Sequence, residues 1–183
     1  MKHAGVPSVG VSLGGNQASE SIAPLDWGGH IPLWHIERHA PDTPVVVVSP
    51  ARDLDANAHA EAGRAIVRAA RSAGRSIAFV ASADQGHGHR ADRPYGFAAE
   101  SATFDARVVD VVRRGALEEL MAFHRAEVLA ALADSWWQMV MLHGALEEDG
   151  ATFRSTFLAY EAPTYYGMLT AVFEPDARSY ATG

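Results

Sequence analysis

Hydrophobic residues along the chain follow several patterns that predict β-strands. Apolar and other residues alternate over 9–13, and a Gly-Gly-Asn turn follows. The unbroken apolar runs at 45–48 and 77–81 are typical of strands buried on both faces, as in parallel sheets. Aromatic and β-branched residues over 153–174 predict two more strands around a proline-containing bend.

Other segments carry apolar residues at helical spacing. Over 56–72, alanines and an isoleucine occupy one face, charged residues take the other, and Gly74 ends the pattern. Comparable patterns predict helices at about 100–114 and 127–146. Pro32 excludes a central strand in the apolar patch around it but allows a helix to start there. Strands that alternate with helices predict an α/β fold, with a central, mostly parallel sheet flanked by helices and a C-terminal strand pair.

Composition narrows the classes of protein to which the chain can belong. With 183 residues, of which 48% are hydrophobic, it is expected to form a single domain over 1–183. Its net charge of −7 is spread along the sequence, which argues against nucleic-acid binding. No apolar run reaches the roughly 18–20 residues of a membrane span and no signal peptide is evident, so a cytoplasmic protein without a membrane partner is expected. The absence of cysteine restricts any metal site to His, Asp, Glu and backbone oxygens.

The segment ASADQGHGH, residues 81–89, is the main candidate for chemistry. It directly follows a predicted buried strand, and ligands of open α/β sheets collect at the carboxyl ends of strands. Gly86 and Gly88 flank His87 with minimal bulk, which would let a substrate ring approach the imidazole closely. An imidazole that titrates near neutral pH can take a proton from a phenol and return it. The alternative is a glycine-rich surface loop with incidental histidines, and the pattern alone does not decide.

Two carboxylates and a pair of histidines are further candidates. Asp26, beside Trp27 and two glycines, is suited either to orient a neighbouring polar group or to form an Asx turn. Asp134 precedes two tryptophans, where a buried acid needs a metal ion, an arginine or solvent to compensate it. His35 and His39 would share one face of a helix and could bind a metal, but no carboxylate accompanies them at a diagnostic spacing.

Several segments, taken in order, resemble the catalytic chain of type III extradiol ring-cleavage dioxygenases, the protocatechuate-cleaving kind and its relatives. The match runs from about Val9 to Pro175, and the chain therefore resembles the C-terminal two-thirds of such a subunit. The segments are SLGGNQASESIAPLDWGGHIPLWHI, VVVVSPARDL, FVASADQGHGHRADRPYGF, FDARVVDVVRRGALEEL, SWWQMVMLHGAL and LAYEAPTYYGML.

The resemblance implies a mononuclear Fe(II) held by two histidines and a carboxylate, with open positions for a catechol and dioxygen. It implies the acid–base role for His87, with Asp26 and His89 as further catalytic candidates. Asp134 stands where the family has its glutamate ligand and is the one metal-ligand candidate. The substrate-binding candidates are Trp27, His30, Tyr95 and Tyr165.

The chain departs from the family pattern in three ways. Trp27 stands where the family's Asp-His-Gly triplet has its histidine, so that role is lost or passes to His30. Asp134, in place of glutamate, keeps the charge but shortens the reach. Both iron-ligand histidines of the family come from strands upstream of the segment that matches Val9, and almost nothing precedes it here. A truncated gene, a partner chain that supplies ligands, and a family member without iron are the open explanations.

The leading hypothesis is therefore extradiol cleavage of a catechol-like aromatic diol with Fe(II) and dioxygen, by an enzyme or part of one. The alternative is a non-catalytic homologue that binds an aromatic ligand or a partner protein through the same pocket. Loss of an N-terminal layer of the fold would expose apolar surface, so we also expect a homo-oligomer, a dimer or higher.

Overall fold

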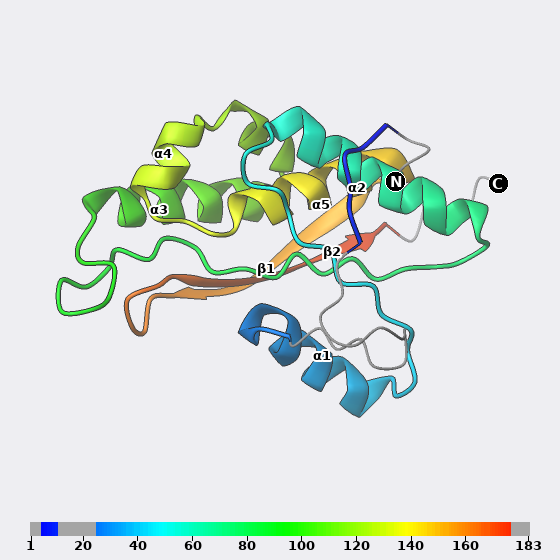
Figure 1. The fold of residues 1–183 in the computed structure, drawn as a ribbon, viewed down its shortest axis with the longest axis horizontal. Helices are drawn as coiled ribbons and strands as arrows, with labels where there is room; N and C mark the ends of the chain where they lie inside the picture. The colour runs from blue at the N-terminus through cyan, green and yellow to red at the C-terminus, as the bar shows by residue number, and fades with distance from the viewer. Residues whose placement is uncertain (1–4, 11–24, 177–183) are drawn as a thin grey trace. The chain divides into compact units, whose positions relative to one another are not determined.

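The computed structural model describes residues 5–10 and 25–176, which fall into two compact units, Met1–Ser49 and Pro50–Gly183. Along the chain the elements are α1 (Trp27–His39), α2 (Ala56–Ser72), α3 (Ala99–Arg114), the short 3-10 helix η3 (Leu117–Ala122), α4 (Arg125–Ala130), α5 (Trp136–Asp149), β1 (Phe153–Glu161) and β2 (Met168–Pro175) (Figure 1). Among these helices, none combines the length and the apolar character that crossing a membrane requires.

The first unit contains α1, which begins earlier than the sequence predicts. Asp26 caps it, because its side chain accepts a hydrogen bond of 2.9 Å from the backbone N–H of Gly29. Pro32 therefore lies inside the helix rather than at its start. Trp27 and Trp34 are exposed on α1, 77% and 48% respectively, so this helix contributes nothing to the buried core of the described residues.

The predicted buried strands at 45–48 and 77–81 do not form, and this prediction was wrong for the described residues. Both segments are extended without being paired in a sheet, and their side chains are largely exposed, with Val46 at 87% and Val80 at 52%. A β-branched run becomes a strand only when a neighbour satisfies its backbone hydrogen bonds, and none of the described segments pairs with these two in a sheet. A central parallel sheet is therefore not seen, and the strand predicted at 9–13 lies mostly outside the described residues.

The C-terminal strand pair is confirmed, and the described part of the chain is a mixture of helices and strands. β1 and β2 pair antiparallel from Phe153 opposite Pro175 to Glu161 opposite Met168, with an irregularity after Phe157. Side chains alternate between the two faces, as expected for a sheet with one buried side. The buried side packs against the helical core through residues that include Phe157, Leu169, Ala171 and Phe173.

The core of the second unit lies between the helices and this sheet. α3 contributes one row of apolar side chains, and α5 contributes Trp136 and Trp137, whose rings meet edge to face at 5.6 Å. Trp137 is fully buried, and the indole N–H of Trp136 donates to the carbonyl of Leu120 on η3 at 2.9 Å. The predicted helix at 100–114 is thus confirmed, one residue longer at its start.

The predicted helix at 127–146 is interrupted in the structure. α4 ends at Ala130 and α5 begins at Trp136, and between them Leu132 adopts a left-handed backbone with φ +52°. A residue other than glycine is rarely found in that region, because its Cβ crowds the backbone. The break at 131–135 therefore needs compensating contacts, and these contacts lie at the candidate site.

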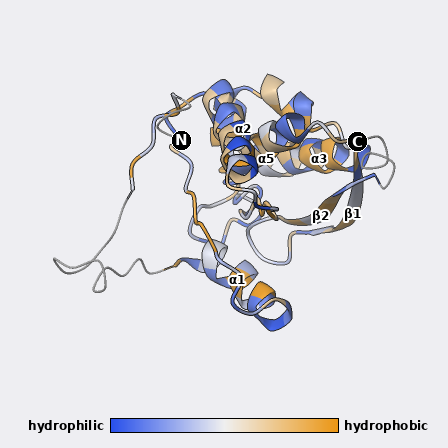
Figure 2. Cartoon of the chain, turned by 90° about the vertical axis from the view of Figure 1, so that its right-hand side faces the viewer, coloured by the Kyte–Doolittle hydropathy of each residue, from blue (hydrophilic) through white to orange (hydrophobic). Residues whose placement is uncertain are grey.

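α2 and α5 pack closely because each helix presents a glycine to the backbone of the other. A Cβ on Gly63 would overlap the carbonyl oxygen of Met141, and a Cβ on Gly144 would overlap that of Ala60. The face of α2 that is turned away from α5 is hydrophilic. Figure 2 shows the hydrophobic and hydrophilic residues around this helix in different colours.

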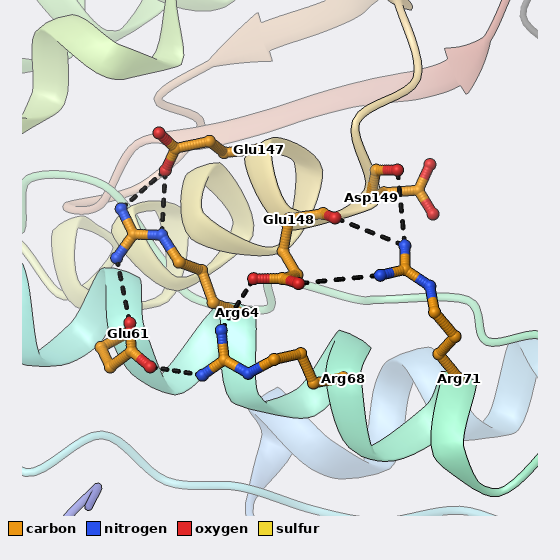
Figure 3. Close-up of polar contacts among 7 residues, drawn as sticks. All are labelled: Glu61, Arg64, Arg68, Arg71, Glu147, Glu148 and Asp149. Carbon is orange, nitrogen blue, oxygen red and sulfur yellow. Dashed lines mark hydrogen bonds and ion pairs between the residues drawn. The ribbon is translucent and has the colours of Figure 1, made fainter. Parts of the chain in front are cut away.

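Ion pairs flank this interface on its exposed side (Figure 3). The Nη2 of Arg64 lies 2.6 Å from the Glu147 carboxylate, and the Nη1 of Arg68 lies 2.7 Å from that of Glu148. The Nη2 of Arg71 reaches the carbonyl oxygen of Glu148 at 3.3 Å. All three arginines come from α2 and their partners here come from α5, so the network fastens the two helices along one side.

Close packing, rather than these exposed ion pairs, is expected to dominate the stability of the α2–α5 interface. Gly144→Ala should lower the free energy of unfolding by about 2 kcal/mol or more, since its Cβ meets rigid backbone. Arg71→Ala, at an exposed position of the same interface, should lower it by about 0.5 kcal/mol or less. Urea unfolding followed by circular dichroism measures both. Equal losses would contradict the ranking.

Candidate active site

A cavity of about 320 Å³ opens in the second unit, where the 84–89 loop meets the break between α4 and α5. This volume is within the range of small-molecule pockets and is sufficient for a single aromatic ring. One part of the lining is apolar and the other carries ionisable side chains. The lining residues are Arg52, His87, Tyr95, Leu129, Leu132, Ala133, Asp134 and Trp137.

His87 lines the cavity with a fixed ring orientation. Its Nδ1 lies 2.8 Å from the carbonyl oxygen of Leu132. A carbonyl only accepts hydrogen bonds, so Nδ1 carries the proton in the neutral ring, and Nε2 is the nitrogen that can gain and lose one. Nε2 lies 3.5 Å from the carboxylate of Asp84. The left-handed backbone at Leu132 thus directs a carbonyl at the imidazole and selects its tautomer.

The electrostatics of the loop favour the protonated form of His87. The Asp84 carboxylate raises the pKa of the imidazole, burial opposes this rise, and the Leu132 carbonyl adds to it. A larger fraction of His87 is therefore protonated near neutral pH than in an exposed histidine. The same carboxylate makes the neutral imidazole a stronger base, because it stabilises the cation that forms when Nε2 accepts a proton.

Tyrosine rings surround the imidazole. The ring centroid of His87 lies 5.3 Å from that of Tyr95, 6.1 Å from that of Tyr165 and 5.8 Å from that of Tyr166. The structure thus brings Tyr95 and Tyr165, two of the predicted substrate-binding residues, to the His87 ring. The other two, Trp27 and His30, lie on α1 of the first unit, where their rings contact each other at 6.4 Å.

The glycines of the loop have a different role from the one that the sequence suggested. A Cβ on Gly86 would lie 2.7 Å from the Cβ of Ser101, and a Cβ on Gly88 would lie 2.5 Å from that of Ala98. Their small size therefore lets the loop approach the start of α3, where the N–H of Gly88 donates to the hydroxyl of Ser101 at 2.9 Å. The close approach is to protein rather than to a substrate ring.

The other catalytic candidates from the sequence are engaged elsewhere. The Nε2 of His89 lies 2.8 Å from the carboxylate of Asp105, which is buried. Asp26 caps α1 in the first unit. Asp105 itself was missed by the sequence analysis, although an acid next to the inward-facing Phe104 of α3 was a signal that could have identified it.

Asp134 is compensated by an arginine, one of the alternatives left open by the sequence. Its carboxylate forms an ion pair with Arg52, whose guanidinium also lies over the ring of Trp137, 5.0 Å from the centroid. Within residues 5–10 and 25–176, no group of three His, Asp or Glu side chains is arranged to hold a metal ion. The described residues thus do not form the two-histidine, one-carboxylate iron site that the resemblance implies.

Removal of the Asp84 charge should lower the pKa of His87. In Asp84→Asn the imidazole keeps its Leu132 contact but loses its principal stabilising anion, and nuclear magnetic resonance titration of the ring measures the change. Since the folded-state pKa is raised, the pair stabilises the fold below the unfolded histidine pKa of about 6.5, and this contribution is lost as pH rises through the folded value. Asp84→Asn should therefore cost more stability at pH 5 than at pH 8. An unchanged His87 pKa would contradict this assignment.

Comparison with known proteins points to one family. Residues 4–173 match the family model described as the catalytic LigB subunit of aromatic ring-opening dioxygenase. Protein CA_C1420 of Clostridium acetobutylicum is 26% identical over 158 residues, which cover 86% of this chain and 33% of the relative. The chain thus spans about a third of the length of the curated relative that it matches.

Proposed function

Because the chain belongs to the family of catalytic LigB subunits of aromatic ring-opening dioxygenases, we propose that its cavity binds a phenolic ring and that His87 exchanges a proton with a ring hydroxyl. The observation that carries this proposal is the fixed imidazole. His87 lines the cavity, Nδ1 is held by the Leu132 carbonyl, and Nε2 is left for proton exchange beside Asp84.

The rest of the cavity supports a flat aromatic ligand. Leu129 and Leu132 offer apolar surface, and Tyr95 adds a ring that meets the imidazole edge to face. When a phenol gives up its proton, His87 becomes cationic, and the neighbouring Asp84 carboxylate stabilises that cation. The oxyanion that forms on the ring is more electron-rich than the phenol, which is the property that ring opening by dioxygen requires.

The finer proposal is extradiol cleavage of a catechol-like diol by dioxygen, of the protocatechuate-cleaving kind. Enzymes of that kind employ Fe(II), which would relay electrons between the ring and dioxygen. Asp134 is the one carboxylate that lines the cavity, and Arg52 pairs with it. We therefore assign the remaining iron ligands of such a reaction to residues outside the described part of the chain or to a partner chain.

A second candidate function is binding without catalysis. The ion pair between Asp134 and Arg52 favours it, because a carboxylate that is already neutralised by an arginine is a weaker metal ligand. In this case the cavity holds an aromatic ligand, or a partner protein's aromatic side chain, and His87 serves as a hydrogen-bond donor or acceptor.

Catechol binding and turnover distinguish these functions. The protein is incubated anaerobically with Fe(II) and catechol, binding is followed by tryptophan fluorescence, and oxygen is then admitted to look for the yellow ring-fission product. His87→Gln should lower product formation about 100-fold or more while the catechol affinity changes only a few-fold, because the proton acceptor is lost but the apolar walls remain. His124→Gln, at an exposed histidine outside the cavity, is the matched control.

Each result of this experiment is informative. Binding with turnover that depends on His87 supports the dioxygenase. Binding without turnover in the presence of Fe(II) supports the non-catalytic homologue. Failure to bind any catechol contradicts both forms of the proposal.

Self-association is also part of the proposal. The extended apolar runs at 45–48 and 77–80 are exposed in the chain as described, and exposed β-branched runs of this kind readily pair with another strand. We expect a dimer or higher oligomer by light scattering at micromolar concentration, and Val46→Lys should shift the population toward the monomer. A monodisperse monomer in the unmodified protein would contradict this expectation.

A further inference from the structure

We propose that Asp105 is a positioning residue that holds the 84–89 loop so that His87 faces the cavity in its reactive orientation. This inference rests on the proposed function of His87. It concerns a residue that does not line the cavity and that acts only through the loop.

Asp105 is a buried carboxylate with an unusual set of partners. It lies in α3, and it is 1% exposed. Burial of a carboxylate is costly unless hydrogen bonds compensate it. Its Oδ1 accepts a bond of 2.7 Å from the N–H of Gly86, and its Oδ2 lies 2.8 Å from the Nε2 of His89 and 2.6 Å from the hydroxyl of Tyr160.

Two of these partners come from the loop itself. Gly86 and His89 lie on either side of His87, so one carboxylate fixes the loop both before and after the imidazole. The hydrogen bond from Tyr160 connects the same carboxylate to β1. Burial, followed by the hydrogen bond to Asp105, raises the pKa of Tyr160, which keeps the phenol protonated as a donor.

Glycines permit the close approach to the carboxylate. A Cβ on Gly86 would lie 3.0 Å from the Oδ1 of Asp105, and a Cβ on Gly167 would overlap Oδ2. Gly167 ends the connection between β1 and β2, and this connection is joined to the 84–89 loop beside the carboxylate. The N–H of Gln85 donates to the carbonyl of Gly167 at 2.8 Å, and the N–H of Gly167 donates to the carbonyl of Gly86 at 3.0 Å. Asp105 is therefore bound to the 84–89 loop at the point where this loop is joined to the segment around Gly167.

A carboxylate accepts hydrogen bonds from these partners better than the corresponding amide does. Every partner at Asp105 is able to donate a hydrogen bond, and the side chain only needs to accept. In asparagine one of the two acceptor oxygens becomes an NH₂ group, and the negative charge is lost. The Tyr160 hydroxyl and the His89 ring can meet this NH₂ only by accepting, so Asp105→Asn keeps the size of the side chain but forces at least one partner to reverse its hydrogen bond or lose it.

The test compares Asp105→Asn with Val112→Ala. Val112 is buried two turns further along α3, so its variant lowers stability at a position roughly 10 Å along the helix from Asp105. Long-range ¹⁵N spectra of the histidine rings, with His87 assigned through His87→Gln, report the tautomer. Catechol titration reports the affinity.

In Asp105→Asn we expect His87 to lose its single Nδ1–H tautomer and the catechol dissociation constant to rise a few-fold, as in His87→Gln, since the imidazole no longer faces the ring hydroxyl. In Val112→Ala both should match the unmodified protein. Asp105→Asn spectra and affinity equal to those of Val112→Ala would overturn the proposal.

Two further measurements distinguish a failure of the Asp105 proposal from misfolding of the variant and from a failure of the proposed function. If Asp105→Asn does not fold, Tyr160→Phe removes one anchor of the carboxylate, and it should perturb the His87 tautomer in the same direction; an unperturbed tautomer would overturn the proposal. If the unmodified protein binds no catechol, the proposed function fails, whereas the ¹⁵N spectra still decide whether Asp105 positions His87.

Discussion

The interruption between α4 and α5 is the constraint on which the site depends. Leu132 adopts a left-handed backbone, which costs about 1 kcal/mol or more for a residue with a Cβ. Contacts with the 84–89 loop offset this cost: the Leu132 carbonyl binds the His87 ring, the N–H of Asp134 donates to the Asp84 carbonyl at 3.2 Å, and the Ser135 hydroxyl donates to the side-chain oxygen of Gln85 at 2.7 Å. The loop and the break thus stabilise each other, and neither would keep its conformation alone.

The charges at the cavity are arranged in compensated pairs. Arg52 neutralises Asp134, and Asp84 stands beside the ring nitrogen of His87. Since Arg52 is 57% exposed and Asp134 is 30% exposed, solvent weakens their attraction, and a pair of this kind contributes about 0–1 kcal/mol. With Arg52 and Asp134 cancelled, a neutral phenol meets little unbalanced charge on entry. Under the proposed function, a proton that Nε2 of His87 accepts would be held where the Asp84 carboxylate stabilises the resulting cation.

The sequence predicted the elements whose patterns are local and missed those that depend on distant partners. The spacing of hydrophobic residues was sufficient to predict α2, α3 and the C-terminal strand pair, because each of them buries a face that its own residues define. The runs at 45–48 and 77–81 have the composition of strands, but a strand also needs a neighbour, and a single run does not specify one. Likewise, the helical pattern at 127–146 does not reveal the break. The contacts that stabilise a left-handed Leu132 come from 45 or more residues upstream, so the local sequence carries no signal of them.

Distant partners also decide the surroundings of the two histidines in the Gly86–His89 segment. The sequence pattern made both of them candidates for catalysis, but the structure gives them different partners. Successive side chains of an extended segment point to opposite sides, but residues two apart share a side only if the backbone stays regular. The hydrogen bonds of Gly86 to Asp105 and of Gly88 to Ser101 bend the loop against α3. His89 is thereby bound to a carboxylate that is 1% exposed, whereas His87, which lines the cavity, meets one that is 44% exposed. Two identical side chains two residues apart thus acquire different surroundings, because the carboxylate beside His89 is buried and the carboxylate beside His87 is partly open to solvent.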